Sequence, residues 1–278
     1  MNIFIEDLKN QEKVCKSVDK SRSFRFMEEL GGNPVISGPC SVESREMILD
    51  FSKALKDLGI TAIRAGAYKP CTFPIRKSIG EWKEGIGEKG LDYLSEVKSE
   101  TGLKIVSEIM DPRQIDKKSM DCIDVIQVGT RNFQNYSLLD ELGSIRKPVL
   151  LKRGTWGTLD EILGACERVI SGGNEKIAIC LRGVVGMPSY RHIFPTVRWA
   201  PDIMMIPALK EITSIPVIYD PSHSTGYSNF VVPISKAAIA AGADGLIVES
   251  HPDPKNSISD AAQAISTSQL QEILRFIR

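Results

Sequence analysis

Five basic side chains lie at or just after the ends of the second, fourth, fifth and sixth apolar runs of the chain: Arg64, Lys69, Arg131, Lys152 and Arg182. Taken singly, each could be a surface residue in a salt bridge. Gathered in one cavity, however, they would need an anionic ligand to offset their mutual repulsion. Arginine and lysine together suit a phosphate and a carboxylate. The residue types therefore predict a site for a small anion that carries both groups.

A second group of residues has the donor atoms that transition metals bind. Cys40 follows the first apolar run, His223 follows the seventh, and Glu249 and Asp260 follow the eighth. One thiolate, one imidazole and two carboxylates suit a divalent transition metal without selecting a particular one. Because a lone cysteine is usually a packing residue and a lone histidine is usually hydrogen-bonded, ordinary packing stays open as the alternative.

Eight short apolar runs rich in valine and isoleucine must position these side chains. Their nearly continuous apolar character is typical of parallel strands buried on both faces. With helical patterns between them, they predict a closed parallel barrel, whose active sites lie at the C-terminal ends of the strands. An open doubly wound sheet uses the same units and is the alternative. The predicted strands are residues 34–37, 61–65, 104–109, 124–129, 148–152, 176–181, 216–220 and 245–249.

Amphipathic stretches between the runs carry the start and stop signals of helices. One opens at Ser44 as an N-cap and ends at Gly59. Another opens with a capping box formed by Thr158 and Glu161 and ends at paired glycines. The predicted helices are residues 44–59, 158–173, 231–243 and 267–277.

The bulk composition limits the class of protein. The 278 residues include Lys+Arg 35 against Asp+Glu 35, so the charge gives no reason to expect nucleic acid or an anionic membrane as a partner. We divide the chain into a polar N-terminal extension, residues 1–30, and a single barrel domain, residues 31–278. No apolar stretch is as long as a membrane span, and the N-terminus is too charged for a signal peptide. With six scattered cysteines, we expect a cytoplasmic protein with reduced thiols.

Seven motifs, in order along the chain, resemble those of one enzyme family. They are GPCSVES, RAGAYKP, GTRNFQN, PVLLKRG, DPSHS, IVESHPDP and SISDAAQA. They are similar to the motifs of 3-deoxy-D-arabino-heptulosonate 7-phosphate (DAHP) synthase, in the compact class related to 3-deoxy-octulosonate 8-phosphate synthase. The resemblance covers residues 33 to 265 and implies an α/β fold of the (β/α)8 TIM-barrel type rather than an open sheet.

This resemblance implies a metal-dependent, aldol-type condensation of phosphoenolpyruvate with an aldose, erythrose 4-phosphate in DAHP synthases, with release of phosphate. It assigns the metal, expected to be Mn, Fe, Co or Zn, to Cys40, His223, Glu249 and Asp260, and phosphoenolpyruvate to the five basic residues. Lys69 is the expected catalytic residue, which would move a proton if burial lowers its pKa. The family further suggests a homodimer or homotetramer.

The acceptor side departs from the family pattern. DAHP synthases have KPRT where this chain has Cys71 followed by Thr72, and the octulosonate enzymes have asparagine at that position. Because the family's arginine helps to hold the acceptor, we expect Cys71 and Thr72 to contact it here. The acceptor stays open between erythrose 4-phosphate and a different aldehyde, unphosphorylated or amino-substituted, from a specialised pathway. A catalytically silent paralogue and a metal-dependent hydrolase are remoter alternatives.

Overall fold

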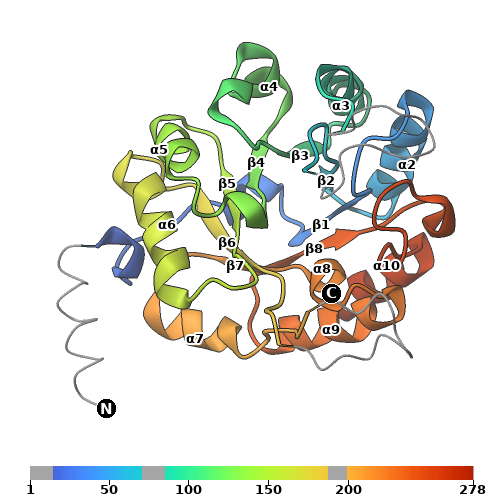
Figure 1. Cartoon of the computed structure of the whole chain (residues 1–278). Coiled ribbons are helices and arrows are strands. Elements are labelled where there is room, and N and C mark those ends of the chain that lie inside the picture. Colours follow the sequence, from blue (N-terminus) through green and yellow to red (C-terminus); the bar gives the residue numbers. More distant parts are fainter. Residues whose placement is uncertain (1–14, 71–84, 187–198, 278) are drawn as a thin grey trace.

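Eight parallel strands form a closed barrel at the centre of the protein (Figure 1). The computed structural model describes residues 15–70, 85–186 and 199–277. Strand β1 pairs with both β2 and β8, so the sheet closes on itself. The strands are β1 Val35–Gly38, β2 Ala62–Arg64, β3 Lys104–Glu108, β4 Val125–Val128, β5 Val149–Lys152, β6 Ile177–Leu181, β7 Val217–Tyr219 and β8 Gly245–Glu249.

Helices surround the barrel and cover the outer face of its strands (Figure 1). Ser44 and Thr158 accept hydrogen bonds from backbone N–H groups at the starts of α2 and α6, so both predicted caps are present. The α-helices are α2 Arg45–Asp57, α3 Glu88–Thr101, α4 Lys117–Cys122, α5 Tyr136–Ser144, α6 Leu159–Ser171, α7 Met205–Ile212, α8 Pro221–Thr225, α9 Ser228–Ala240 and α10 Thr267–Ile277. Short 3-10 helices are η1 Lys16–Val18, η2 Met27–Leu30, η3 Pro112–Gln114, η4 Thr130–Asn132 and η5 Pro254–Asn256.

The predicted (β/α)8 barrel is confirmed. Each predicted strand agrees with an observed strand to within one residue at either end. The helix predicted at 231–243 was placed too late, because α9 begins at Ser228 and ends at Ala240. Its first turn, formed by Ser228, Asn229 and Phe230, precedes the apolar pattern on which the prediction depended.

The N-terminal end of the barrel is closed by residues from the predicted extension. Phe26 and Leu30 are buried against apolar side chains that point into the barrel. Thr61, which precedes β2, donates its hydroxyl to the carbonyl of Leu30 at 2.6 Å. This part of the extension is therefore packed into the fold, and the boundary at residue 30 stays a prediction. In the described part of the chain, no helix has the length and apolar character needed to cross a bilayer.

Candidate active site

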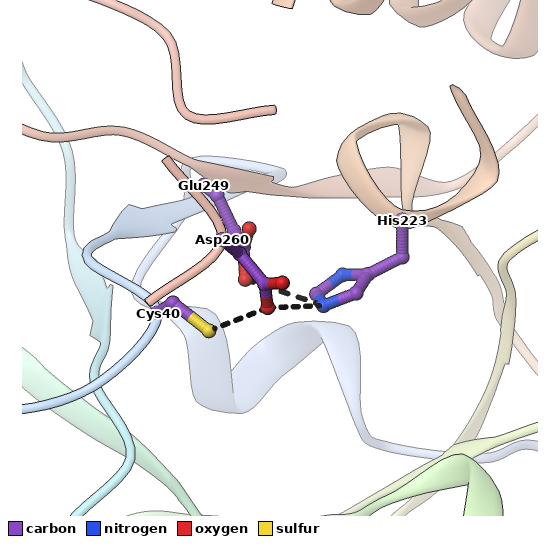
Figure 2. Close-up of side chains that lie close together, drawn as sticks. All are labelled: Cys40, His223, Glu249 and Asp260. Carbon is purple, nitrogen blue, oxygen red and sulfur yellow. Dashed lines mark hydrogen bonds and ion pairs between the residues drawn. The ribbon is translucent and has the colours of Figure 1, made fainter. Parts of the chain in front are cut away.

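Four side chains with metal-binding atoms converge at the C-terminal end of the barrel (Figure 2). Glu249 ends β8, and Cys40 lies two residues after β1, the strand beside it. His223 lies on α8, which follows β7, and Asp260 lies in the segment after β8. One ligand atom of each residue lies within 4.8 Å of those of the others. These four residues, the metal-binding group, are the ones that the resemblance assigned to a metal.

The donor atoms of the metal-binding group face one another. Cys40 Sγ donates to Asp260 Oδ2 at 3.1 Å, and His223 Nε2 lies 3.3 Å from Glu249 Oε1. Within the described residues, Glu249 Oε1 is buried without a directed hydrogen bond, although Arg64 Nη1 lies 3.1 Å from it. A buried acceptor that lacks a hydrogen bond needs another partner. Sulfur, nitrogen and oxygen donors in this arrangement fit a divalent transition metal.

Burial and charge set the protonation of the group. Burial raises the pKa of the Cys40 thiol, and the negative charge of Glu249 raises it further. Burial lowers the pKa of His223, so the imidazole is neutral at pH 7. Burial alone would raise the pKa of Glu249, but its interactions with His223 and with the Arg64 guanidinium outweigh burial and lower that pKa. The neutral imidazole and the ionised carboxylate are the forms that bind metals, while the thiol must lose its proton as a metal binds.

Asp220, the N-cap of α8, fixes the orientation of His223. Its Oδ1 accepts the backbone N–H of His223 at 2.9 Å, and its Oδ2 pairs with His223 Nδ1 at 2.7 Å. Because Nδ1 carries the proton in that pair, Nε2 keeps its lone pair toward the metal-binding group. Lys152 Nζ also donates to Asp220 Oδ2, at 2.5 Å. Burial would raise the pKa of Asp220, but its interactions with His223 and with the Lys152 ammonium hold it well below its usual value.

Asp260 reaches the group from an uncommon backbone conformation. Its φ of 55° is the one positive value among the described residues other than glycine. Aspartate enters this left-handed region more readily than most residues, but still at a cost in free energy. Such conformations persist where the surrounding structure holds them, and they gather at functional sites.

A cavity of about 580 Å³ opens beside the metal-binding group. Its lining includes all five predicted cations: Arg64, Lys69, Arg131, Lys152 and Arg182. His223 and Asp260 line the same cavity. The anion site and the metal-binding group inferred from the sequence are therefore two parts of one site, and its basic lining favours an anionic ligand.

Lys69 lies between the two parts of this site. Its Nζ donates to Cys40 Sγ and lies 3.9 Å from Asp260 Oδ2. Burial lowers the pKa of Lys69, but its interaction with Cys40 and the negative charges of Glu249 and Asp260 outweigh burial and raise it. The lowering that burial alone predicts is therefore not found. Lys69 is an ammonium group that can hold an anion or donate a proton.

Glu108, at the end of β3, places a carboxylate among these cations. The side chain is 6% exposed, and Gln127 Nε2 donates to its Oε2 at 3.2 Å. Its other oxygen, Oε1, is buried and has no hydrogen-bond partner in the described part of the chain. A Cβ atom at Gly129 would lie 2.0 Å from Oε1, so glycine is needed there to admit the carboxylate. Oε1 is therefore available to a ligand or a water molecule in the cavity.

The predicted site residues have different outcomes. The described residues bring together the metal-binding group and the five cations, whose individual roles stay predictions. Cys71 and Thr72, the predicted acceptor contacts, lie outside the described residues. Two contributors had no role assigned from the sequence: Asp220, within the DPSHS motif beside His223, and Glu108, at a strand end. Trp156 and Trp199, which also line the cavity, gave no signal in the sequence pattern.

Comparison with known proteins places this geometry in a family. The model of the DAHP synthetase I family matches residues 29–278. Phospho-2-dehydro-3-deoxyheptonate aldolase of Thermotoga maritima is 40% identical over 241 residues, which cover 87% of this chain and 68% of the relative. The 2-dehydro-3-deoxyphosphooctonate aldolase of Desulfotalea psychrophila is 30% identical over 260 residues, 87% of this chain and 88% of the relative.

Solved structures agree with the sequence comparison. The crystal structure of the Thermotoga maritima DAHP synthase matches with a TM-score of 0.79 at 39% identity, over 88% of this chain and 67% of that one. A truncated form of the same enzyme matches with a TM-score of 0.76 at 38% identity, over 88% and 85% of the two chains. The resemblance seen in the seven motifs is confirmed: this chain is an enzyme of the DAHP synthase type and belongs to the DAHP synthetase I family.

Proposed function

We propose that this enzyme condenses phosphoenolpyruvate with an aldose, in a metal-dependent reaction that yields a 3-deoxy-2-keto sugar acid and phosphate. The observation that carries the proposal is the convergence of five cations and the metal-binding group on one cavity. Erythrose 4-phosphate is the first candidate acceptor, because the Thermotoga maritima relative is named for a phosphorylated heptonate.

The cations suit phosphoenolpyruvate as the donor. This molecule presents a carboxylate and a phosphate, the two groups that arginine and lysine bind with charge-assisted hydrogen bonds. Arg64 and Lys152 are each 3% exposed, so their contacts with an anion would be little screened by water. Holding both ends of the donor fixes C2 and C3 against the metal-binding group, and such positioning can supply a large part of the rate enhancement.

The reaction needs one new carbon–carbon bond and one molecule of water. C3 of phosphoenolpyruvate bonds to the aldehyde carbon, whose oxygen gains a proton. Water adds at C2 and loses a proton, and the resulting hemiketal phosphate expels inorganic phosphate. We propose that Glu108 Oε1 accepts the proton from water and that Lys69 donates a proton within the same cavity. A bound divalent ion would supply Lewis-acid polarisation of the aldehyde oxygen.

One observation favours a second acceptor class. Of the five cations, Arg64 already faces Glu249, Lys69 faces Asp260 and Lys152 faces Asp220. These pairings, together with the carboxylate of Glu108 in the same lining, lower the net positive charge that the cavity offers to a second phosphate. An unphosphorylated aldehyde is therefore the second candidate, consistent with Cys71 at the position of the family's arginine.

A single assay tests the reaction and the acceptor together. The full chain is incubated with phosphoenolpyruvate, one of Mn²⁺, Fe²⁺, Co²⁺ or Zn²⁺, and each of several aldehydes, and phosphate release is measured. We expect release that requires both an aldehyde and the metal. Release without any aldehyde would indicate a hydrolase, and tight phosphoenolpyruvate binding without release would indicate a silent paralogue. Efficient turnover of erythrose 4-phosphate would refute the second acceptor class.

Assembly and location complete the proposal. We propose a cytoplasmic homodimer or homotetramer that acts on small molecules, with neither nucleic acid nor membrane as a partner. The balanced charge of the chain supports the exclusion of large anionic partners. Light scattering on the eluate of a sizing column would measure the assembly, and a monomer at micromolar concentration would refute that part.

A further inference from the structure

Glu43 is not a member of the metal-binding group, but it links the chain segments that carry two of its members, Cys40 and Asp260. It lies three residues after Cys40, in the segment that follows β1, and its side chain is 13% exposed. Its Oε1 accepts the backbone N–H of Ile258 at 3.0 Å and the hydroxyl of Ser257 at 3.1 Å. Both donors lie just before Asp260 in the chain. One carboxylate oxygen thus joins the segment of the first ligand to the segment of the last.

A buried histidine supports this carboxylate from the other side. His251 is 4% exposed, and its Nε2 lies 3.4 Å from Glu43 Oε1. Its Nδ1 accepts the backbone N–H of Asp253 at 3.0 Å. Since Nδ1 is the acceptor, a neutral His251 carries its proton on Nε2, facing Glu43. Two donors therefore hydrogen-bond to one oxygen, the N–H of Ile258 and the hydroxyl of Ser257, and the His251 ring lies beside that oxygen. All three residues come from the segment that follows β8.

The segment that holds Glu43 is itself fixed to the barrel. Gly66, just after β2, donates its N–H to the carbonyl of Cys40 at 3.3 Å and accepts the N–H of Val42 at 3.0 Å. Ser259 Oγ donates to Cys40 Sγ at 3.3 Å, so the two segments also meet at the thiol. Glu43 therefore extends from a rigid base toward a segment whose last residue, Asp260, has the unfavourable φ of 55°.

We propose that Glu43 is a positioning residue for metal binding, which holds residues 257–260 so that Asp260 presents its carboxylate beside Cys40 before the ion arrives. The role rests on the proposed metal-dependent function. Without the two hydrogen bonds from Ser257 and Ile258, residues 257–260 would relax toward ordinary backbone angles, and ordering them again would reduce metal affinity. Partners that orient ligands in this way typically contribute about 10- to 100-fold to metal affinity.

The experiment measures metal binding rather than turnover. The full-length protein is stripped of metal, and Co²⁺ and Zn²⁺ are titrated against a competing chelator, with the thiolate-to-Co²⁺ absorption band as a second readout. We expect Glu43→Ala to lower the affinity about 10- to 100-fold and Glu43→Gln, which keeps an acceptor oxygen for Ile258 and Ser257, to lower it less. Glu46→Ala, an exposed carboxylate three residues further on, is the matched control and should bind like the wild type.

A double-mutant cycle tests whether Glu43 acts through Asp260. If it does, Glu43→Ala should have little further effect on metal affinity in an Asp260→Ala background. Independent, multiplying losses in that background would overturn the proposal, as would wild-type affinity in Glu43→Ala. If Glu43→Ala does not fold, the same cycle is run with Glu43→Gln, and wild-type affinity there together with an unchanged Co²⁺ band overturns it. Failure of the wild-type protein to bind either metal would instead refute the proposed function itself.

Discussion

Replacing Asp220 with asparagine should damage stability and metal binding together, because one buried carboxylate serves two partners. Asparagine keeps an acceptor oxygen for the cap of α8 but removes the negative charge opposite Lys152, whose Nζ lies 2.5 Å from Oδ2. Both side chains are almost fully buried, at 4% and 0% exposed. Removing one member of a buried ion pair costs about 3–5 kcal/mol. The lower end applies here, since Lys152 reaches the cavity.

The same substitution removes the group that fixes the tautomer of His223. The asparagine nitrogen is a donor, so the Nδ1 position opposite it is best satisfied as an acceptor, which places the proton on Nε2. That proton would lie where Glu249 and Asp260 now face the ring, 3.3 and 3.8 Å away. The lone pair needed by a metal is then lost, and we expect metal affinity to fall by about 10- to 100-fold.

Two measurements separate these effects. Thermal unfolding of the metal-free protein should show a midpoint lower by roughly 6–12 °C for a loss of about 3 kcal/mol. Adding Lys152→Met should recover part of that loss, because it removes the uncompensated ammonium group. It should not recover metal affinity, which depends on the histidine. A variant as stable as the wild type, or a double variant no more stable than Asp220→Asn, would refute the assignment of the charge pair.

Three further outcomes are expected. Cys40→Ser should weaken metal binding sharply, and EDTA should abolish activity until metal is restored; full activity in metal-free protein contradicts the metal site. Glu108→Gln should lower kcat by about 10²- to 10⁴-fold with phosphoenolpyruvate affinity, measured by calorimetry, largely kept; an unchanged kcat excludes it as the base. Burial raises the pKa of Cys166 and raises that of Cys180 to about 12, so neither thiol should react in the native protein at pH 8. Mass mapping after alkylation checks this, and rapid labelling of either contradicts the burial.

The strands of the barrel could be predicted from the sequence because they are buried on both faces. Such strands are short, continuous apolar runs, and each predicted run is an observed strand to within one residue. What the runs could not decide was closure, since the pairing of β1 with β8 joins residues more than 200 positions apart, such as Val35 and Leu246. The sequence of either strand alone does not show whether its free edge pairs with another strand or faces solvent. The prediction of a closed barrel rather than an open sheet therefore depended on the family motifs and not on the periodicity.

The candidate site could be predicted from the sequence only in part, because some of its residues have a role that depends on contacts between distant segments. Cys40, His223, Glu249 and Asp260 have side chains whose chemistry suggests a role wherever they fall, so their types and strand-end positions pointed to them. Glu43 has equally suggestive chemistry, but its function depends on which residues meet it in space. Its partners Ser257 and Ile258 lie 214 and 215 residues away.

The electrostatics of Lys69 show how one contact can reverse a prediction made from burial. A lysine withdrawn from water should have a lowered pKa, and that rule suggested a proton carrier. The structure places its ammonium against Cys40 and near Asp260, and these interactions, with the charge of Glu249, more than offset burial. A divalent ion bound by the same residues would neutralise much of that charge. If that ion binds as proposed, metal binding and the protonation of Lys69 are coupled, because the same side chains interact with both.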